Sequence, residues 1–110
     1  MPNKNNKYSN TDIFKELGFS EQEAGNLKVR SKLMHEITQY IESQNITQVE
    51  AAERFGVSQP RISDLMRGKL HVFTVDTLIN MLHRVGYNVQ LNVLLPNFAG
   101  GKEELKTREG

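Results

Sequence analysis

A short stretch near the middle of the chain carries side chains that could read the edges of base pairs. Gln59 and Arg61 stand at the start of the stretch Ser58 to Arg67. A glutamine amide can pair with adenine through two hydrogen bonds, and an arginine guanidinium can pair with guanine in the same way. Ser63 could contact a base or a phosphate, whereas Asp64 could accept from cytosine N4 but would repel a nearby phosphate. We therefore take Gln59 and Arg61 as the best candidate base readers.

The chain offers little support for other kinds of chemistry. It has no Cys, which excludes disulfides and thiolate metal sites. His35, His71 and His83 lack metal-ligand spacing with one another and with carboxylates, so a structural role is the better interpretation of each. The sequence shows no Ser/His/Asp order, no credible pair of carboxylates and no phosphate-cradling glycine loop. We therefore expect no enzyme activity, no cofactor and no metal.

Composition places the chain among ordinary globular proteins. Its 110 residues are 37% hydrophobic and 25% charged, which fits one domain with a modest core. No apolar run could cross a bilayer, and no apolar stretch follows the basic N-terminus as it would in a signal peptide, so a cytoplasmic protein is expected. Residues 1–10 and 97–110 are polar or glycine-containing and are predicted to be a flexible arm and a flexible tail around one domain, 11–96. Because the formal net charge is only +1, nucleic-acid binding would depend on where the charges lie.

Helical patterns occupy the first half of this domain. A short helix is expected over residues 12–17, ended by Gly18. Ser20 and Glu23 then form a capping box, in which the hydroxyl and the carboxylate each accept from a backbone N–H of the first turn. The long helix that follows should reach about Ser43 and bury the positions that recur at helical spacing, namely Leu27, Met34, Ile37 and Ile41.

Three shorter helices should follow. Thr47 opens one with a second capping box, and this helix ends near Phe55. Ser58 caps the next, which runs to about Arg67 with Pro60 in its first turn, where a missing N–H costs little. The last helix begins at Thr74 and ends before a glycine at position 86.

The hydrophobic period changes after this last helix. Val89, Leu91 and Val93 alternate with polar residues over Tyr87–Leu94, which is typical of a strand with one buried face. A lone strand cannot satisfy its own backbone donors and acceptors. The simplest partner is the same strand of a second subunit, so we predict a homodimer that pairs through residues 87–94.

The segment Gln48 to Arg67 meets the packing requirements of two short helices that cross steeply. Such a pair needs a small residue at the crossing and a glycine in the turn, which Ala52 and Gly56 provide. It also needs apolar side chains that point back from both helices. These are Phe55, Val57, Ile62 and Leu65.

This segment resembles the helix-turn-helix of the lambda-repressor-like family, also called the Cro/CI or XRE family. The family pattern has Gln at the start of the first helix, Ala four residues later, Gly four after that, and then a β-branched residue and Leu in the second helix. The matching residues are Gln48, Ala52, Gly56, Ile62 and Leu65. The resemblance covers about residues 20 to 85. It implies an all-α bundle of about five helices, to which the strand at 87–94 would add a dimer contact.

The resemblance also implies a sequence-specific DNA-binding regulator of transcription, most simply a repressor, that acts as a dimer on double-stranded DNA. The second helix would enter the major groove with its N-terminal end first. Gln48 would bond a phosphate, and Arg67 and Lys69 would contact the backbone beyond that helix. The DNA-binding residues expected on this basis are Gln48, Ser58, Gln59, Pro60, Arg61, Ser63, Asp64, Arg67 and Lys69, and the dimerisation residues are Val89, Leu91 and Val93.

A narrower similarity suggests an alternative function. The stretches Phe19–Ser31 and Ser58–Leu65, with Thr47 and Gln48 between them, are similar to small XRE proteins that resemble HigA-type antitoxins. Many of these are encoded beside a toxin. The similarity implies an antitoxin that binds a toxin protein and autoregulates the operon of the pair.

Blander interpretations remain for the domain and for one of its charged clusters. The helical pair could be an ordinary hairpin in an adaptor module without a DNA role, and a salt titration of DNA binding would separate that from the other two functions. Lys28, Arg30 and Lys32 are interpreted as a solvated face of the long helix, with phosphate contact as the alternative.

Overall fold

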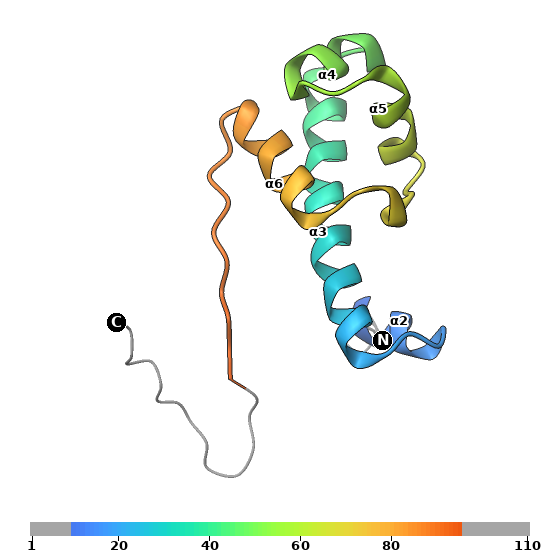
Figure 1. The fold of residues 1–110 in the computed structure, drawn as a ribbon. Helices are drawn as coiled ribbons and strands as arrows, with labels where there is room; N and C mark the ends of the chain where they lie inside the picture. The colour runs from blue at the N-terminus through green and yellow to red at the C-terminus, as the bar shows by residue number, and fades with distance from the viewer. Residues whose placement is uncertain (1–9, 96–110) are drawn as a thin grey trace, which may run out of the picture.

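A computed structural model describes residues 10–95 of the chain and is all-helical over that range. Its elements are α2 (Asn10–Glu16), α3 (Glu21–Gln44), α4 (Gln48–Phe55), α5 (Gln59–Met66), the 3-10 helix η1 (Leu70–Val72) and α6 (Val75–Arg84). The long helix α3 runs through the bundle, with α4 and α5 at one end and α2 at the other (Figure 1). The expected bundle of about five helices is confirmed. The predicted tail lies outside the described residues, as does the predicted arm except for Asn10, the first residue of α2.

The two predicted capping boxes fix where α3 and α4 begin. The Ser20 hydroxyl accepts from the backbone N–H of Glu23, and the Glu23 carboxylate accepts from the backbone N–H of Ser20, both over 3.1 Å. Thr47 and Glu50 make the same reciprocal pair over 3.1 and 2.9 Å. Each box satisfies backbone donors that the helix itself leaves without a partner. The start of the helical pair is therefore set by local sequence.

The hydrophobic core lies between α3 and the three helices that follow it. Leu27, Met34, Ile37 and Ile41 are buried as predicted, and Ala24 and Leu33, which the sequence analysis did not name, are buried too. Of these six residues, Leu33, Met34, Ile37 and Ile41 form the face of α3 in this core. Phe55 from α4, Ile62 from α5 and Leu78 from α6 are each at most 1% exposed against it. A side chain of this size contributes about 1.5–3 kcal/mol when fully buried. This packing holds α4 and α5 in a fixed orientation on the upper half of α3.

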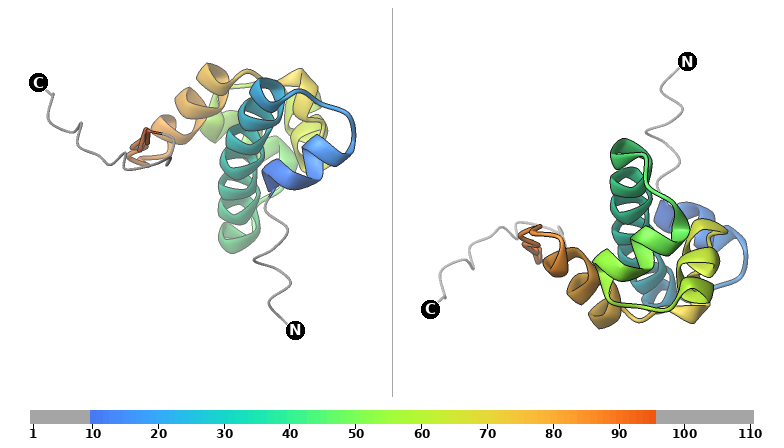
Figure 2. Two further views of the ribbon diagram at one scale, coloured as in Figure 1. Left: turned by 90° about the horizontal axis from the view of Figure 1, so that it is seen from below. Right: turned by 90° about the horizontal axis from the view of Figure 1, so that it is seen from above.

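Residues 87–95 leave α6 as an extended segment. The segment lies beyond α6, on the side of the bundle away from α5 and α2 (Figures 1 and 2). Val89 packs against the core, whereas Leu91 and Val93 are 66% and 90% exposed. These residues form no helix or strand within the single chain that the structure describes. Pairing with a second subunit through this segment therefore stays a prediction.

Two further findings apply to the same described range. No helix between residues 10 and 95 is long and apolar enough to span a membrane. Over those residues, the structure also places no group of three or more His, Asp or Glu side chains where they could hold a metal ion.

Candidate nucleic-acid interface

The turn between α4 and α5 is built around one glycine. Gly56, the glycine that the sequence analysis placed in the turn, adopts the left-handed conformation, with φ 73° and ψ 34°. The backbone N–H groups of Gly56 and Val57 both donate to the carbonyl of Ala52, over 2.9 and 3.0 Å. Ser58 then caps α5 by accepting from the backbone N–H of Arg61. A glycine tolerates this backbone at little cost, so the chain can reverse within three residues.

The second helix of the pair buries one side and exposes the other. Ile62 and Leu65 are 0% and 1% exposed, and they pack in the same cluster as Ala52 and Phe55. Gln59 is exposed at the start of α5. The buried side fixes the rotation of α5 about its own axis, so the N-terminal end of α5 is presented to solvent.

Arg61 differs from Gln59 because its own chain holds its guanidinium. The Nη1 atom donates to the Val72 carbonyl over 2.9 Å, and Cζ lies 5.2 Å from the centre of the Phe73 ring. The side chain is half-buried between α5 and the loop that contains η1. Within the described residues only Nη1 takes part in a hydrogen bond, so the other guanidinium nitrogens keep their donors. The base-reading role of Arg61 is still a prediction, but the contacts to Val72 and Phe73 hold its guanidinium in one orientation.

Three of the predicted site residues form a charged cluster at the far end of α5. Asp64 lies 3.4 Å from Arg67 Nη2 and 3.6 Å from Lys69 Nζ. The carboxylate is 27% exposed, whereas the two cations are 60% and 41% exposed. Their positive charges offset the repulsion that Asp64 alone would exert on a phosphate. Exposed pairs of this kind contribute at most about 1 kcal/mol, so both cations can turn toward another anion at low cost.

The remaining predicted residues lie in three places. Gln48 is the half-buried first residue of α4, and Ser58 and Pro60 are exposed at the start of α5, with the half-buried Ser63 one turn further along. The dimerisation residues lie apart from these, in the segment 87–95 on the other side of the bundle (Figure 1). The predicted DNA-binding residues are thus close together on α5 and the loop after it, and the predicted dimer contact is separate.

Comparison with known proteins agrees with this geometry. A family model described as a helix-turn-helix domain matches residues 13–94. The chain belongs to this helix-turn-helix domain family. A solved structure assigned provisionally to the XRE family of transcriptional regulators matches the helix-turn-helix chain with a TM-score of 0.63 at 23% identity, covering 80% of this chain and 90% of the other. That likeness shows an XRE-like fold, and the comparison with curated proteins gives no match.

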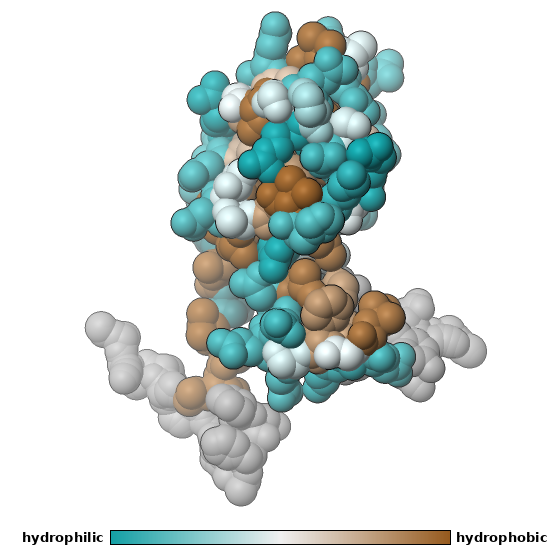
Figure 3. Space-filling view, turned by 45° about the vertical axis from the view of Figure 1, so that its right-hand side comes forward, coloured by the Kyte–Doolittle hydropathy of each residue, from teal (hydrophilic) through white to brown (hydrophobic). Residues whose placement is uncertain are grey.

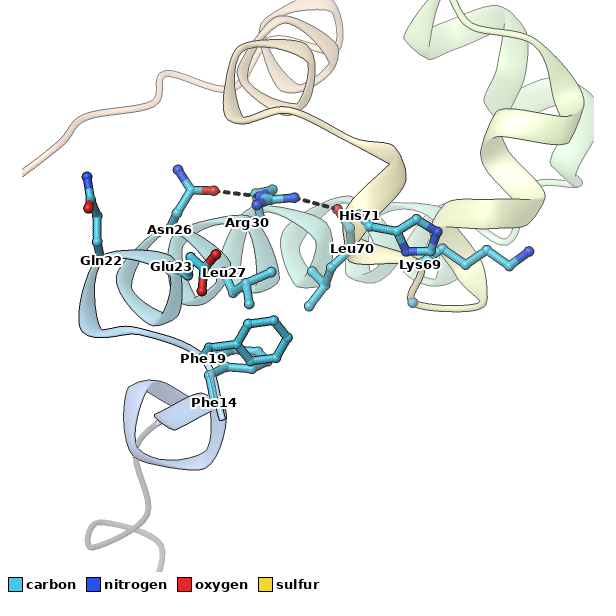
Figure 4. Close-up of a pocket in the computed structure, with 11 residues that line it drawn as sticks. Phe14, Phe19, Gln22, Glu23, Asn26, Leu27, Arg30, Lys69, Leu70 and His71 are labelled. Atoms are coloured by element: carbon cyan, nitrogen blue, oxygen red, sulfur yellow. Dashed lines mark hydrogen bonds between the residues drawn. The ribbon is translucent and has the colours of Figure 1, made fainter. Parts of the chain in front are cut away.

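Sequence reasoning missed how the loop after the helix-turn-helix is held. Arg30 on α3 donates to the carbonyls of Leu70 and Phe73, over 2.9 and 3.3 Å, and to Asn26 over 2.7 Å. Figure 4 shows the bonds to Leu70 and Asn26. The interpretation as a solvated face is therefore wrong for Arg30. Together with Arg61, it fixes three carbonyls of one short loop, the loop that follows Lys69. No local sequence pattern indicates this contact, because Arg30 and Leu70 are 40 residues apart in sequence.

A groove beside this loop was also not predicted. It has a volume of about 750 Å³ and lies between α2, the first half of α3 and η1. Phe14 and Phe19 lie on one side of it, opposite Leu27 and Leu70 (Figure 4). The two phenylalanine rings meet edge to face with centroids 6.2 Å apart. The helix-turn-helix chain thus has an apolar recess next to the residues that follow the C-terminal end of α5, apart from the exposed N-terminal end of that helix.

Proposed function

We propose that the protein is a sequence-specific DNA-binding regulator of transcription that inserts α5 into the major groove. The observation that carries this proposal is the exposed N-terminal end of α5, on a helix whose opposite side is buried. On that side Ile62 and Leu65 are at most 1% exposed. In helix-turn-helix proteins this end of the second helix is the part that meets base edges. Membership of the helix-turn-helix domain family supports the same reading.

Base recognition in this proposal is shared between two side chains with different freedom. Gln59 is exposed and can turn its amide toward an adenine. Arg61 reaches a neighbouring guanine with its remaining guanidinium donors while Val72 and Phe73 keep the group in place. A group that is already fixed loses less side-chain entropy on binding, so its contact is more selective. Ser63, one turn further along, contacts a base or a phosphate.

Contacts to the DNA backbone set the position of α5 in the groove. Gln48 bonds a phosphate from the start of α4, where free backbone N–H groups add partial positive charge. Arg67 and Lys69 exchange their ion pairs with Asp64 for phosphates beyond the C-terminal end of α5. These contacts carry affinity and register but no sequence information.

The regulator acts as a dimer on a two-fold operator. One unit offers few phosphate contacts and the chain has a formal net charge of only +1, so a second unit is needed for useful affinity. Val89, Leu91 and Val93 provide the dimer contact, and the half-sites lie about 34–36 Å or a multiple apart. Occupying an operator blocks access by other proteins, so repression is the simplest regulatory outcome.

Selection of bound sequences from random duplex DNA tests this function directly. We expect a two-fold symmetric motif with a fixed half-site spacing. Gln59→Ala should then weaken binding to the selected site by about 1–3 kcal/mol, or roughly 5- to 150-fold. Gln39→Ala, at an exposed position of α3, is the matched control and should leave binding unchanged. No enriched motif, or equal effects of the two substitutions, would refute the proposal.

Binding a toxin protein is the second candidate function, and the apolar groove favours it. Phe19, which lines this groove, is 42% exposed, and Ile13 and Leu17 in the preceding residues are 43% and 69% exposed. Figure 3 shows hydrophobic side chains toward the end of the molecule that carries α2. Exposed apolar patches of this kind commonly mark protein-binding surfaces. The groove is partly lined by residues of Phe19–Ser31, the stretch that is similar to HigA-type antitoxins.

The antitoxin role requires a toxin-like reading frame beside the gene and a complex with its product. Phe19→Ala should weaken that complex measurably in titration calorimetry, whereas Val49→Ala, which alters an exposed apolar residue of α4, should not. Absence of a complex between the two purified proteins would remove this function and leave DNA binding unaffected.

A further inference from the structure

We propose that the two subunits of the dimer pair their segments in an antiparallel manner about Leu91, and that Leu95 of each protomer covers the Tyr40–Tyr87 pair of its partner. The inference rests on the proposed dimer and names the register and the surface that the dimer buries. It therefore says which residues complete the interface and how far apart it holds the two helix-turn-helix units.

The register follows from which residues share a face. In an extended segment alternate residues point the same way, so Tyr87, Val89, Leu91, Val93 and Leu95 share one face. Residues directly opposite each other in an antiparallel pair also share a face. Pairing about Leu91 places every one of these apolar residues opposite an apolar residue of the partner. Val89 then lies opposite the partner's Val93, and Tyr87 lies opposite the partner's Leu95.

Other registers lose part of this match. A shift by one residue places the apolar face of one strand opposite the polar face of the other. A shift by two residues in one direction brings the partner's Leu95 opposite Val85, which ends α6 with φ −102° and ψ 16° and is not extended. A shift by two in the other direction leaves Tyr87 opposite an asparagine at position 97.

The first part of this apolar face packs against the body of its own protomer. Val89 already packs against the core of its own chain, and Tyr87 lies edge to face with Tyr40, with ring centroids 6.1 Å apart. Tyr87 is nonetheless 37% exposed, and Leu95 is 62% exposed. A leucine laid over the two rings removes apolar surface from water on both sides of the contact. In the proposed register the partner's Leu95 is the residue in position to do this.

The Tyr40–Tyr87 pair that the partner would cover contacts the helix-turn-helix directly through Tyr40. The Tyr40 ring also meets Phe55 of α4 at 5.3 Å, and its hydroxyl accepts from Arg54 over 3.0 Å. Partner contact at Tyr87 therefore packs on the ring that supports the end of α4. The register also sets spacing: Tyr87 and the partner's Tyr87 lie eight residues apart along the ribbon, or about 26 Å at 3.3 Å per residue. A two-residue shift would change that separation by about 7 Å.

Cysteine cross-linking of the full-length chain tests the register, because the natural sequence has no Cys. Three single variants, Leu91→Cys, Gln90→Cys and Asn92→Cys, each place one thiol near a different two-fold axis. We expect Leu91→Cys alone to form an inter-chain disulfide under mild oxidation. In that register the thiols of each of the other variants lie about 8 Å apart on the diagonal, which is beyond disulfide reach. Preferential cross-linking of either neighbour would overturn the register.

Sedimentation equilibrium tests the proposed packing of Leu95 on the Tyr40–Tyr87 pair of the partner. Leu95→Ala should raise the dimer dissociation constant about tenfold or more, since each dimer loses two buried leucines. Leu94→Ala removes the same side chain from the opposite face and should have less than a third of that effect. In the Tyr87→Ala background the Leu95 substitution should lose its effect. The packing of Leu95 on the aromatic pair would be overturned if Leu95→Ala and Leu94→Ala raised the dissociation constant equally. It would also be overturned if Leu95→Ala kept its full effect in the Tyr87→Ala background.

These outcomes are separable from those of the proposed function. A chain that stays monomeric at all concentrations overturns this inference and the dimeric part of the proposed function, whereas base reading by α5 is judged separately by Gln59→Ala. Specific cross-linking of the Leu91→Cys variant, with no DNA motif enriched by selection, supports the inference and removes the proposed function.

Discussion

Removing the Arg61 side chain should weaken the fold and the reading of DNA by separate amounts. Its guanidinium donates to the Val72 carbonyl over 2.9 Å and lies 5.2 Å from the Phe73 ring centre. A hydrogen bond from a charged group contributes about 1.5–3 kcal/mol, and a cation–π contact about 0.5–1 kcal/mol at an exposed site. Because the side chain is only half-buried, we take the lower end of each range. Arg61→Ala should therefore lower the free energy of unfolding by about 2 kcal/mol.

The two effects are measured under different conditions. Urea unfolding followed by circular dichroism gives the loss of stability. DNA binding is then measured well below the unfolding midpoint, where both proteins are folded, on the selected operator and on random duplex. We expect the ratio of the two affinities to fall by a further 1–3 kcal/mol, or about 5- to 150-fold. Arg61→Lys keeps the charge but not the planar fork, so it should retain affinity for random DNA while losing most of the preference.

Each half of this prediction can fail by itself. Unchanged urea unfolding of Arg61→Ala would mean that the contacts to Val72 and Phe73 do not stabilise the loop. An unchanged ratio of operator to random binding would mean that Arg61 is a structural residue and that Gln59 reads the bases without it.

Three further predictions concern the surroundings of the site. Gly56→Ala should destabilise the fold by about 1–2 kcal/mol because an alanine is strained at φ 73°. Gly25→Ala, in α3 with open space around the added methyl, should instead stabilise the fold by about 0.5–1 kcal/mol. Urea unfolding measures both changes. Asp64→Asn should tighten binding to random DNA several-fold in a fluorescence anisotropy titration, because it frees two cations. Arg30→Ala should cost about 1–3 kcal/mol of stability in the same unfolding assay, against less than about 0.5 kcal/mol for the exposed Lys32→Ala.

The outcomes that would contradict these three are specific. Shifts of the same sign for the two glycine substitutions would show that backbone conformation does not decide the first. Weaker random binding by Asp64→Asn would mean that the carboxylate positions its cations rather than competing for them. A small effect of Arg30→Ala would mean that water satisfies the loop carbonyls equally well.

The parts of the fold that depend on neighbouring residues were predictable from sequence. Ser20 and Thr47 cap helices through residues three positions away, and Gly56 permits a turn whose partners lie within five residues. The buried stripe of α3 was legible because helical periodicity is local too. Family resemblance extended this to the pairing of α4 with α5, since Ala52 and Ile62 occupy the positions that such a pair must bury.

The parts that depend on distant residues were not predictable. Arg30 and Arg61 look like surface cations in sequence, and only the path of the chain brings carbonyls of the η1 loop to their guanidinium groups. The groove at α2 forms because Phe14 and Phe19 come to lie opposite Leu70, which is far away along the chain. The alternating segment after α6 is a different case, because its pattern is plain but its proposed partner is a second copy. Local pattern predicts elements, and it leaves open the long-range contacts that position a loop or fill an interface.

The dependence of DNA binding on salt should reveal how many subunits bind at once. Each helix-turn-helix unit brings two exposed cations, Arg67 and Lys69, to the proposed DNA backbone contact. Each neutralised phosphate contributes about −0.9 to the slope of log K against log salt on B-form DNA. A dimer on a two-fold site should therefore show a slope of about −3.6, and a monomer on a half-site about −1.8. A slope near −1.8 on the full operator would mean that the second unit adds no phosphate contacts, and a slope near zero would mean that Arg67 and Lys69 do not contact the DNA backbone.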